Sequence, residues 1–564
     1  MEMEPPMPVL DVSTSANKNR PLSESAIRRL TGVYYTPSSA ADFMADWIVR
    51  HDGEHILEPS FGEGIFLQSV AASNARRNFD RVRLTGVEID EAARAQAQGN
   101  LAGLDVDLRC ADFLSVVPYP VHGVIGNPPY VRLRNLPDAQ KVRAMEAAGL
   151  VMGQPMEPSG SLWMPFVLHA MRFLTVGGRM ALVLPYELTY VRYARPLWDT
   201  LRDRFGSLQV LRTHERLFPD ILQDVVILLA DEYGARTQFV QYQAFERVPD
   251  LLAEHPLVDE HLPIEDLLRG RRPFVEALLG PDLRQLLRGR IAAVTVPTRN
   301  LVTFNIGYVT GDKNFFHPKL EVTREYCLPE ASLHPALTST RGLKSVGLST
   351  SSLKAEEMER LFLPGDDPLT AGERRYIEWG EENGVAGRYK CQVREPWYGV
   401  PGVRVPDLIL SVFSERPVLL INDAEYFASN SLLCGFSDGL TGAEIVTRWY
   451  TSLTLLQCEL EVHALGGGVM VLIPGEVGNI RLPRRVIAQD DHLDHLDCQL
   501  KQGDTAGAYQ SGDRKVLIDQ LGFSQDNVQL IRHGIGILAH WRTSSRSSLE
   551  VKTDGRNREP VLAI

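Results

Sequence analysis

The stretch Gly123-Val124-Ile125-Gly126-Asn127-Pro128-Pro129-Tyr130 sets the fold class of this chain. Its apolar first half predicts a buried parallel strand, and open α/β sheets bind ligands where such strands end. The two prolines fix φ and remove backbone donors, so no local N–H group claims the neighbouring carbonyl oxygens. The Asn side-chain oxygen and such a carbonyl oxygen together form a rigid pair of acceptors that suits an –NH2 group. Tyr130 offers an aromatic face on which a flat ring can stack. A plain proline turn is the alternative for the tetrapeptide alone.

Strand and helix patterns alternate on both sides of this stretch, from about residue 31 to residue 243. Further short apolar strands are predicted at 55–58, 83–88, 180–185 and 224–229, with helical patterns such as 40–50 and 162–174 between them. Such alternation indicates a mainly parallel sheet with helices on both faces.

The rest of the chain differs in texture from this α/β region. We predict a disordered tail at 1–25, the α/β domain at 26–243, a helical connector at 244–290, a β-rich or mixed domain with C-terminal helices at 291–541, and a loose tail at 542–564. The first 25 residues lack the basic start and apolar stretch of a signal peptide.

Composition limits the class of protein. Apolar residues make up 44% and charged residues 23% of the 564 residues, as in soluble globular proteins. No apolar run approaches the roughly 20 residues that cross a bilayer. The net charge of −12 argues against non-specific coating of nucleic acid, although a locally basic cleft can still bind DNA. Candidate basic stretches lie at Arg132 with Arg134, at 269–272 and at 481–485.

The cysteines give no sign of a disulfide framework or a zinc ribbon, because no two of them form a CxxC pair. They are Cys110, Cys327, Cys391, Cys434, Cys458 and Cys498. A reduced, cytoplasmic setting fits this pattern. We interpret the Asp- and His-containing segment 490–495 as a solvated acidic helix face, since no further ligand cluster accompanies it, and we expect no metal site.

Three carboxylates follow successive predicted strands. Glu58 precedes a glycine-containing loop at 60–64, where a ligand can approach the backbone closely. This loop is neither a GxGxxG nor a GK[ST] motif, so it favours a cationic ligand over a pyrophosphate. Glu88 is placed to bind ribose hydroxyls, and Asp112, beside the aromatic Phe113, can accept from an adenine amino group. Together they predict a pocket for a cationic adenosine ligand, which S-adenosylmethionine (SAM) fits.

Five motifs in this order resemble the gamma-class amino-methyltransferases, specifically the adenine-N6 DNA methyltransferases of type II restriction–modification systems. They are Tyr34-Tyr35-Thr36-Pro37, Leu57-Glu58-Pro59 with Gly62 and Gly64, Gly86-Val87-Glu88, Ala111-Asp112-Phe113, and Asn127-Pro128-Pro129-Tyr130. The match spans about residues 31–232. It implies an α/β fold: a Rossmann-like, mixed seven-stranded SAM-dependent methyltransferase domain, followed by a mixed or β-rich target-recognition domain.

The C-terminal half is similar to such a target-recognition domain through fewer residues. These are Gly307-Tyr308-Val309-Thr310-Gly311, Asn314-Phe315-Phe316, Tyr389-Lys390, Arg394, Trp397-Tyr398, Asn430-Ser431, Gly466-Gly467-Gly468 and Leu482-Pro483.

The resemblance also implies roles for individual residues. Asn127 and the Pro128 carbonyl would accept the two hydrogens of the target amine, while Tyr130 and Phe218 would stack on the two faces of the flipped base. The implied SAM-binding residues are Thr36, Glu58, Pro59, Ser60, Phe61, Glu88, Asp112, Phe113 and Pro129. The implied reaction transfers the methyl group of SAM to N6 of an adenine in double-stranded DNA and so protects the site from a cognate restriction endonuclease.

Other reactions stay open at this point. Cytosine-C5 methylation is set aside, because it needs a cysteine nucleophile, usually in a Pro-Cys pair, and no cysteine here follows a proline. Cytosine-N4 methylation uses the same amine chemistry, and RNA or protein-glutamine methyltransferases can share the Asn-Pro-Pro-Tyr motif. We expect a monomer that acts without a membrane and without a stable complex with its endonuclease.

Overall fold

The computed structural model describes residues 36–218, 223–253, 255–340, 343–354, 358–365, 368–465 and 468–543. The predicted tail at 1–25 and nearly all of the tail at 542–564 lie outside these ranges. Several motif residues also lie outside them: Tyr34, Tyr35, Gly466 and Gly467.

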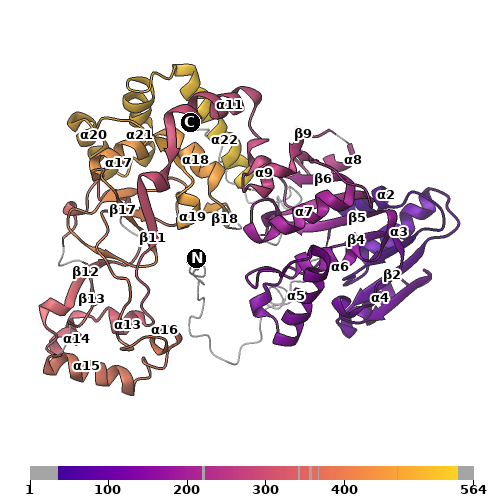
Figure 1. Cartoon of the computed structure of the whole chain (residues 1–564), viewed down its shortest axis with the longest axis horizontal. Coiled ribbons are helices and arrows are strands. Elements are labelled where there is room, and N and C mark those ends of the chain that lie inside the picture. Colours follow the sequence, from indigo (N-terminus) through magenta and orange to yellow (C-terminus); the bar gives the residue numbers. More distant parts are fainter. Residues whose placement is uncertain are drawn as a thin grey trace, which may run out of the picture. The chain divides into compact units, whose positions relative to one another are not determined.

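The chain forms two compact units (Figure 1). The first unit comprises Met1–Leu211, Val225–Val240 and Leu251–Ala253, and the second comprises Arg212–Asp224, Gln241–Asp250 and Glu254–Ile564. These units are defined by contacts between residues, whereas the predicted domain boundaries come from changes in sequence pattern. Those boundaries remain predictions.

A nine-stranded sheet with the order β3-β2-β1-β4-β5-β7-β6-β8-β9 dominates the N-terminal half. Its strands are β1 His55–Glu58, β2 Arg83–Glu88, β3 Val106–Cys110, β4 Val121–Gly126, β5 Leu174–Pro185, β6 Phe205–Thr213, β7 Val225–Tyr233, β8 Phe239–Phe245 and β9 Val258–Pro263. The strands predicted from apolar runs are all present. The first five strands pair in parallel, whereas β7 runs antiparallel to both β5 and β6, which makes the sheet mixed.

Two strands extend the sheet beyond the seven that were expected. β9 lies within 244–290, so this predicted connector is not helical throughout. Its residues Val258–Pro263 include two acids and a histidine, and most are exposed or half-buried. Because a short, charged edge strand lacks the apolar run that marks a buried strand, the sequence pattern did not reveal it.

One helix, α2, precedes the first strand, and further helices lie between the strands that follow. They are α2 Ser38–Ile48, α3 Ile65–Arg76, α4 Glu91–Asn100, α5 Asp138–Met152, α6 Trp163–Met171 and α7 Arg195–Arg204. α2 and α6 fall on the predicted helical patterns, and α2 packs on α3 and on β4 and β5. Short helices α8 Asp250–Ala253, α9 Ile264–Leu268, α10 Pro273–Glu276 and α11 Pro281–Leu286 follow β8.

A buried ion pair ties α2 to the sheet. Arg179, on β5, contacts Glu54 with two nitrogen–oxygen distances of 2.6 and 2.7 Å, and its Nε donates to the carbonyl of Ile48. Both charged side chains are 5% exposed. The carbonyl at the end of α2 and the carboxylate before β1 therefore depend on one guanidinium.

The second unit has mixed α/β structure with several small sheets. The largest has the order β11-β17-β14-β15, and a three-stranded sheet has the order β13-β12-β16. Its strands are β10 Thr295–Pro297, β11 Val302–Ile306, β12 Leu333–Leu337, β13 Glu359–Phe362, β14 Leu408–Ser411, β15 Leu419–Ile421, β16 Phe427–Ala428, β17 Leu432–Ser437, β18 Ala464–Leu465, β19 Val469–Met470 and β20 Arg481–Pro483.

Helices of the second unit lie between and after these strands. They are α12 Ala292–Val294, α13 Lys313–Phe316, α14 Leu320–Glu325, α15 Ala371–Glu382, α16 Tyr389–Gln392, α17 Gly442–Trp449, α18 Ser452–Glu461, α19 Pro474–Val477, α20 Asp490–Lys501, α21 Thr505–Gly512 and α22 Gln525–Arg542. α22 falls on the predicted C-terminal helical pattern and packs on α18. The predicted acidic segment 490–495 begins α20.

Candidate active site at the carboxyl ends of the parallel strands

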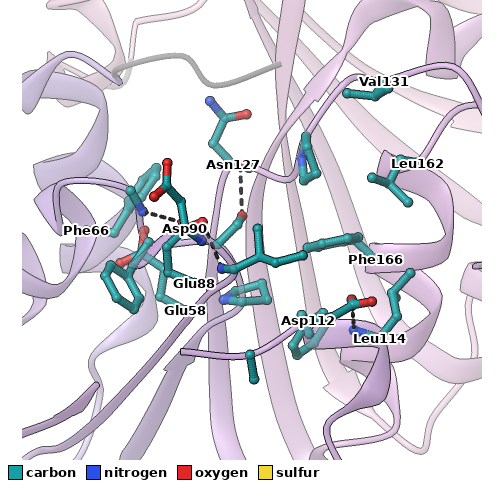
Figure 2. A pocket seen from close by; sticks show the side chains of 18 of the residues that line it. Glu58, Phe66, Glu88, Asp90, Asp112, Leu114, Asn127, Val131, Leu162 and Phe166 are labelled. Carbon is teal, nitrogen blue, oxygen red and sulfur yellow. Dashed lines mark hydrogen bonds between the residues drawn. The ribbon is translucent and has the colours of Figure 1, made fainter. Parts of the chain in front are cut away.

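A cavity of about 530 Å³ opens beyond the carboxyl ends of β1, β2, β3 and β4 (Figure 2). β1 pairs in parallel with β2 on one side and with β4 on the other, so the winding of the sheet reverses between β1 and β4. Ligands bind at such a switch point because the loops diverge there and leave a crevice. The structure brings all nine predicted SAM-binding residues and Asn127 to the wall of this cavity: Thr36, Glu58, Pro59, Ser60, Phe61, Glu88, Asp112, Phe113 and Pro129.

Glu58 places a buried carboxyl group in the cavity wall. The residue is 1% exposed, and its Oε2 has no hydrogen-bond partner. Burial, together with the nearby Glu88 carboxylate, raises the pKa of Glu58 well above its ordinary value. A buried polar atom without a partner is costly, and a ligand that donates hydrogens or carries positive charge would relieve the cost.

Glu88 fastens the loop at 60–64 from the next strand. Its carboxylate accepts from the backbone N–H of Gly62 at 3.0 Å and from those of Ile89 and Asp90 at 2.9 and 3.1 Å. Gly64 has φ +84°, and a Cβ there would lie 2.9 Å from the Leu101 side chain. The loop therefore needs glycine for its left-handed turn, and Glu88 holds it against β2.

Asp112 begins a short 3₁₀ turn, Phe113–Ser115, and its side chain accepts from the Leu114 N–H at 3.1 Å. It also forms an ion pair with Arg143 of α5. Phe113 is 2% exposed and packs on Phe166 with ring centroids 5.3 Å apart. The carboxylate is thus oriented by two contacts before any ligand arrives, and the aromatic group is already held in place.

The Asn-Pro-Pro-Tyr segment is fastened on both sides. The Ser60 hydroxyl donates to the Asn127 carbonyl at 3.1 Å, which links the loops after β1 and β4. The Tyr130 hydroxyl lies 2.6 Å from Asn127 Oδ1 and 3.0 Å from the carbonyl of Val183 on β5. The hydroxyl has one hydrogen, so it donates to one of these two oxygens at a time, and both contacts hold Tyr130 beside Asn127.

The remaining predicted site residues do not line this cavity. Pro128 is buried and Tyr130 is half-buried, both directly beside lining residues. Phe218 is 3% exposed and belongs to the second compact unit, so its part as the second aromatic clamp stays a prediction.

Sequence reasoning missed part of the cavity wall. The additional lining residues include Asp90, Val131, Gln140, Leu162 and Phe166. Asp90 was within reach of motif reasoning, because it follows Glu88 by two residues. Gln140 and Phe166 come from α5 and α6, whose approach to the cavity depends on packing that no local pattern encodes.

A network of hydrogen bonds supports the chain just after Tyr130. Glu187 accepts from Arg132 at 2.8 Å, from the Trp163 indole at 3.2 Å and from the Tyr193 hydroxyl at 2.6 Å. Glu187 is buried, and the network connects the segment that follows Tyr130 to α6. Arg132, a candidate DNA-binding cation by sequence, is therefore engaged within the protein.

Comparisons with known proteins agree with this geometry. Residues 24–193 match the family N-6 DNA Methylase, and residues 271–517 match the C-terminal domain of type II methyltransferase M.Eco57I. Type II methyltransferase M.AccI from Acinetobacter calcoaceticus is 22% identical over 423 residues, covering 72% of this chain and 76% of that protein. M.PaeR7I from Pseudomonas aeruginosa is 25% identical over 444 residues, covering 70% and 73%.

Solved structures are more distant. The type IIG restriction endonuclease BpuSI has a TM-score of 0.43 and 13% identity, covering 91% of this chain and 66% of its own. A modification subunit of a putative type I restriction enzyme from Vibrio vulnificus has a TM-score of 0.31 and 20% identity, covering 38% and 47%. Among the described residues, no helix is both long and apolar enough to span a membrane.

Proposed function

We propose, on the premise that the chain belongs to the N-6 DNA methylase family, that its cavity binds the methyl donor and that Asn127 receives the target amine. The chain is an adenine-N6 DNA methyltransferase of a restriction–modification system, as its family and its type II relatives indicate. The family depends on SAM. Which residues hold SAM and the base is our proposal.

The cavity wall fits SAM in charge and in polarity. Glu58 offers a buried oxygen without a partner, which suits the positively charged methionine end of the donor. Glu88 and Asp112 follow in strand order and suit ribose hydroxyls and an adenine amino group. Bound SAM would supply an electrophilic methyl group, and these residues would fix its position and keep its cationic end out of water.

Asn127 and Pro128 would activate the target nitrogen. An aromatic amine is a weak nucleophile because its lone pair is delocalised into the ring. Accepting both N–H bonds at Asn127 Oδ1 and at the Pro128 carbonyl favours a pyramidal nitrogen with an available lone pair. The same two oxygens stabilise the positive charge that develops on nitrogen, and they need no reorganisation during the reaction.

The target base must leave the duplex to reach this site. Unstacking costs a few kcal/mol, and stacking on aromatic side chains offsets part of it. Tyr130 would supply one face, since its hydroxyl is anchored to Asn127 and to β5. Phe218 would supply the other. The substrate is double-stranded DNA, and we further propose a monomer that acts in the cytoplasm, separately from its endonuclease.

The observation that carries this proposal is that Asn127 lines the same cavity as Glu58, whose buried Oε2 has no hydrogen-bond partner. Replacing Asn127→Ala should lower methyl incorporation into a duplex library by about 10²- to 10³-fold, as expected for loss of a preorganised polar group. SAM binding, measured by calorimetry on the same preparation, should change little. Unchanged turnover in this variant would contradict the assigned role. Mapping the methylated base would separate adenine-N6 from cytosine-N4 transfer.

A further inference from the structure

One ion pair connects helix α5 to the carboxylate that follows β3. Arg143, on α5, pairs with Asp112, which lines the cavity. Gln140, one turn earlier on the same helix, lies in the cavity wall, whereas Arg143 does not. Because residues three positions apart share a helix face, α5 places Gln140 at the cavity and Arg143 at the carboxylate beside it.

The backbone at Asp112 is held without Arg143. The Ser115 N–H donates to the Asp112 carbonyl at 2.9 Å, which closes the short 3₁₀ turn. Phe113, the next residue, is buried and packs on Phe166 with ring centroids 5.3 Å apart. The freedom that remains at Asp112 is therefore rotation of its carboxylate group.

Each oxygen of this carboxylate accepts a hydrogen bond. Oδ1 accepts from the Leu114 N–H at 3.1 Å (Figure 2), and Oδ2 accepts from Arg143 Nη1. The terminal torsion of an Asp side chain is broad, so the bond to Leu114 alone leaves the plane of the carboxylate variable. The bond to Arg143 at the other oxygen defines that plane. Since an ionised carboxylate has about four lone-pair sites, it can still accept from a ligand.

The ion pair itself adds little to folding. The Arg143 and Asp112 side chains are 41% and 20% exposed, and pairs this close to solvent contribute little to stability. Removing the guanidinium should therefore leave the protein folded. What the pair supplies is the orientation of Asp112 toward the cavity.

We infer that Arg143 is a positioning residue that holds Asp112 in the orientation that recognises the 6-amino group of the donor's adenine. This inference rests on the proposed function, which assigns Asp112 to that group. A fixed acceptor favours a purine that carries the amino group, because a purine without it leaves the acceptor unpaired. Arg143 thus sets how strictly the cavity selects an adenine-containing donor over other purine analogues.

Calorimetry on the full-length protein with two nucleoside probes tests this inference. The probes are S-adenosylhomocysteine and its analogue in which hydrogen replaces the 6-amino group. The ratio of their Kd values, analogue over parent, measures the contribution of the amino group. We expect a ratio of about 10–100 in the wild type, the value of a hydrogen bond to a charged group, and no preference in Asp112→Ala. Arg143→Gln should lower the ratio at least about threefold, the lower end for groups coupled in one hydrogen-bond network.

The matched control is Arg76→Gln. Arg76, on α3, pairs with Asp46 of α2 at 2.6 Å, its side chain is 51% exposed, and neither residue lines the cavity. This variant should keep the wild-type ratio, and thermal melting would show that both arginine variants fold.

The outcomes separate this inference from the proposed function. A merely structural role of Arg143 would weaken both probes equally, so an unchanged ratio in Arg143→Gln beside a discriminating wild type would overturn the inference alone. An unfolded Arg143→Gln would overturn it too, because the ion pair would then act on the fold. A wild type that does not discriminate, or an Asp112→Ala variant that still does, would contradict the assignment of Asp112 and with it the inference.

Discussion

In the proposed assignment, Glu58 would link cofactor binding to a proton. In the free protein, burial raises the pKa of this carboxyl group, so the neutral form predominates to a higher pH than in solution. A cationic donor bound beside Glu58 would favour the carboxylate, so binding would release the proton. The same raised pKa makes the stability of the free protein fall as pH rises. The folded state holds the proton more tightly than the unfolded chain does, so this group lowers the free energy of unfolding as pH rises above its ordinary pKa of 4.5.

We expect SAM affinity to rise with pH through the raised pKa of Glu58, by up to about tenfold per pH unit below it. Calorimetry in buffers of different ionisation enthalpy would measure the released proton. Glu58→Gln should weaken binding and remove the pH dependence. Glu146→Gln, on the exposed face of α5, should behave as the wild type. A pH-independent affinity in the wild type would contradict the link.

Tyr130 has two proposed tasks, to orient Asn127 and to stack on the target base, and substitution can separate them. Tyr130→Phe keeps the ring but removes the hydroxyl that orients Asn127, so we expect kcat to fall by about tenfold, the value of about one lost hydrogen bond. Tyr130→Ala also removes the stacking face and should raise the KM for DNA as well, since stacking on an aromatic ring is worth about 1–3 kcal/mol per base. Equal kinetics for the two variants would argue against stacking. SAM affinity is the internal control.

At the scale of elements, the sequence predicts the cavity residues at the strand ends better than it predicts the contacts that other elements make with them. The proposed site residues stand in short motifs at strand ends, so the amino-acid sequence alone was enough to predict that Glu58, Glu88 and Asn127 lie at one cavity. Asp112 was placed too, but its ion pair with Arg143 could not be, because the two residues lie 31 positions apart on different elements. Edge strand β9 escaped for a similar reason: its partners, not its own apolar pattern, make it a strand.

The Glu54–Arg179 pair allows a test of how α2 is held. Arg179→Leu leaves a buried carboxylate without its cation and should lower the free energy of unfolding by about 3–5 kcal/mol. Adding Glu54→Leu should recover much of that loss, because no unpaired charge is then buried. Urea denaturation of the full chain measures both changes. A double variant no more stable than Arg179→Leu would show that the pair contributes chiefly through its bond to Ile48.

At the scale of the whole molecule, an acidic protein has to bind a polyanion through a local surface. The basic stretch at 269–272 does not provide it: Arg269, Arg271 and Arg272 pair with Glu265, Asp266 and Glu476. The segment 388–404 of the second unit is a better candidate. It contains four basic residues and one acid, Glu395, and lies within the region that matches the M.Eco57I C-terminal domain.

The segment presents an exposed aromatic side chain beside a cationic one, and DNA contacts use both kinds. Tyr389 is 74% exposed, and the Lys390 ammonium lies 5.7 Å from its ring centroid. Other side chains hold this segment against residues 309–312: Arg394 donates to the carbonyls of Val309 and Thr310, and Arg388 pairs with Asp312. We therefore expect Lys390 to contact a phosphate and Tyr389 to contact sugar or base.

Salt dependence can isolate the contribution of Lys390. Each phosphate neutralised by a basic side chain adds about 0.9 to the slope of log K against log salt concentration. Lys390→Ala should reduce this slope by about one and weaken DNA binding several-fold at low salt, with equal loss on specific and random duplexes, because phosphate contacts carry no sequence information. Lys501→Ala, whose ammonium pairs with Asp497 at 2.7 Å, should leave the slope unchanged. If both variants retain the wild-type slope, the 388–404 segment does not contact the backbone, and the basic surface for DNA lies elsewhere in the chain.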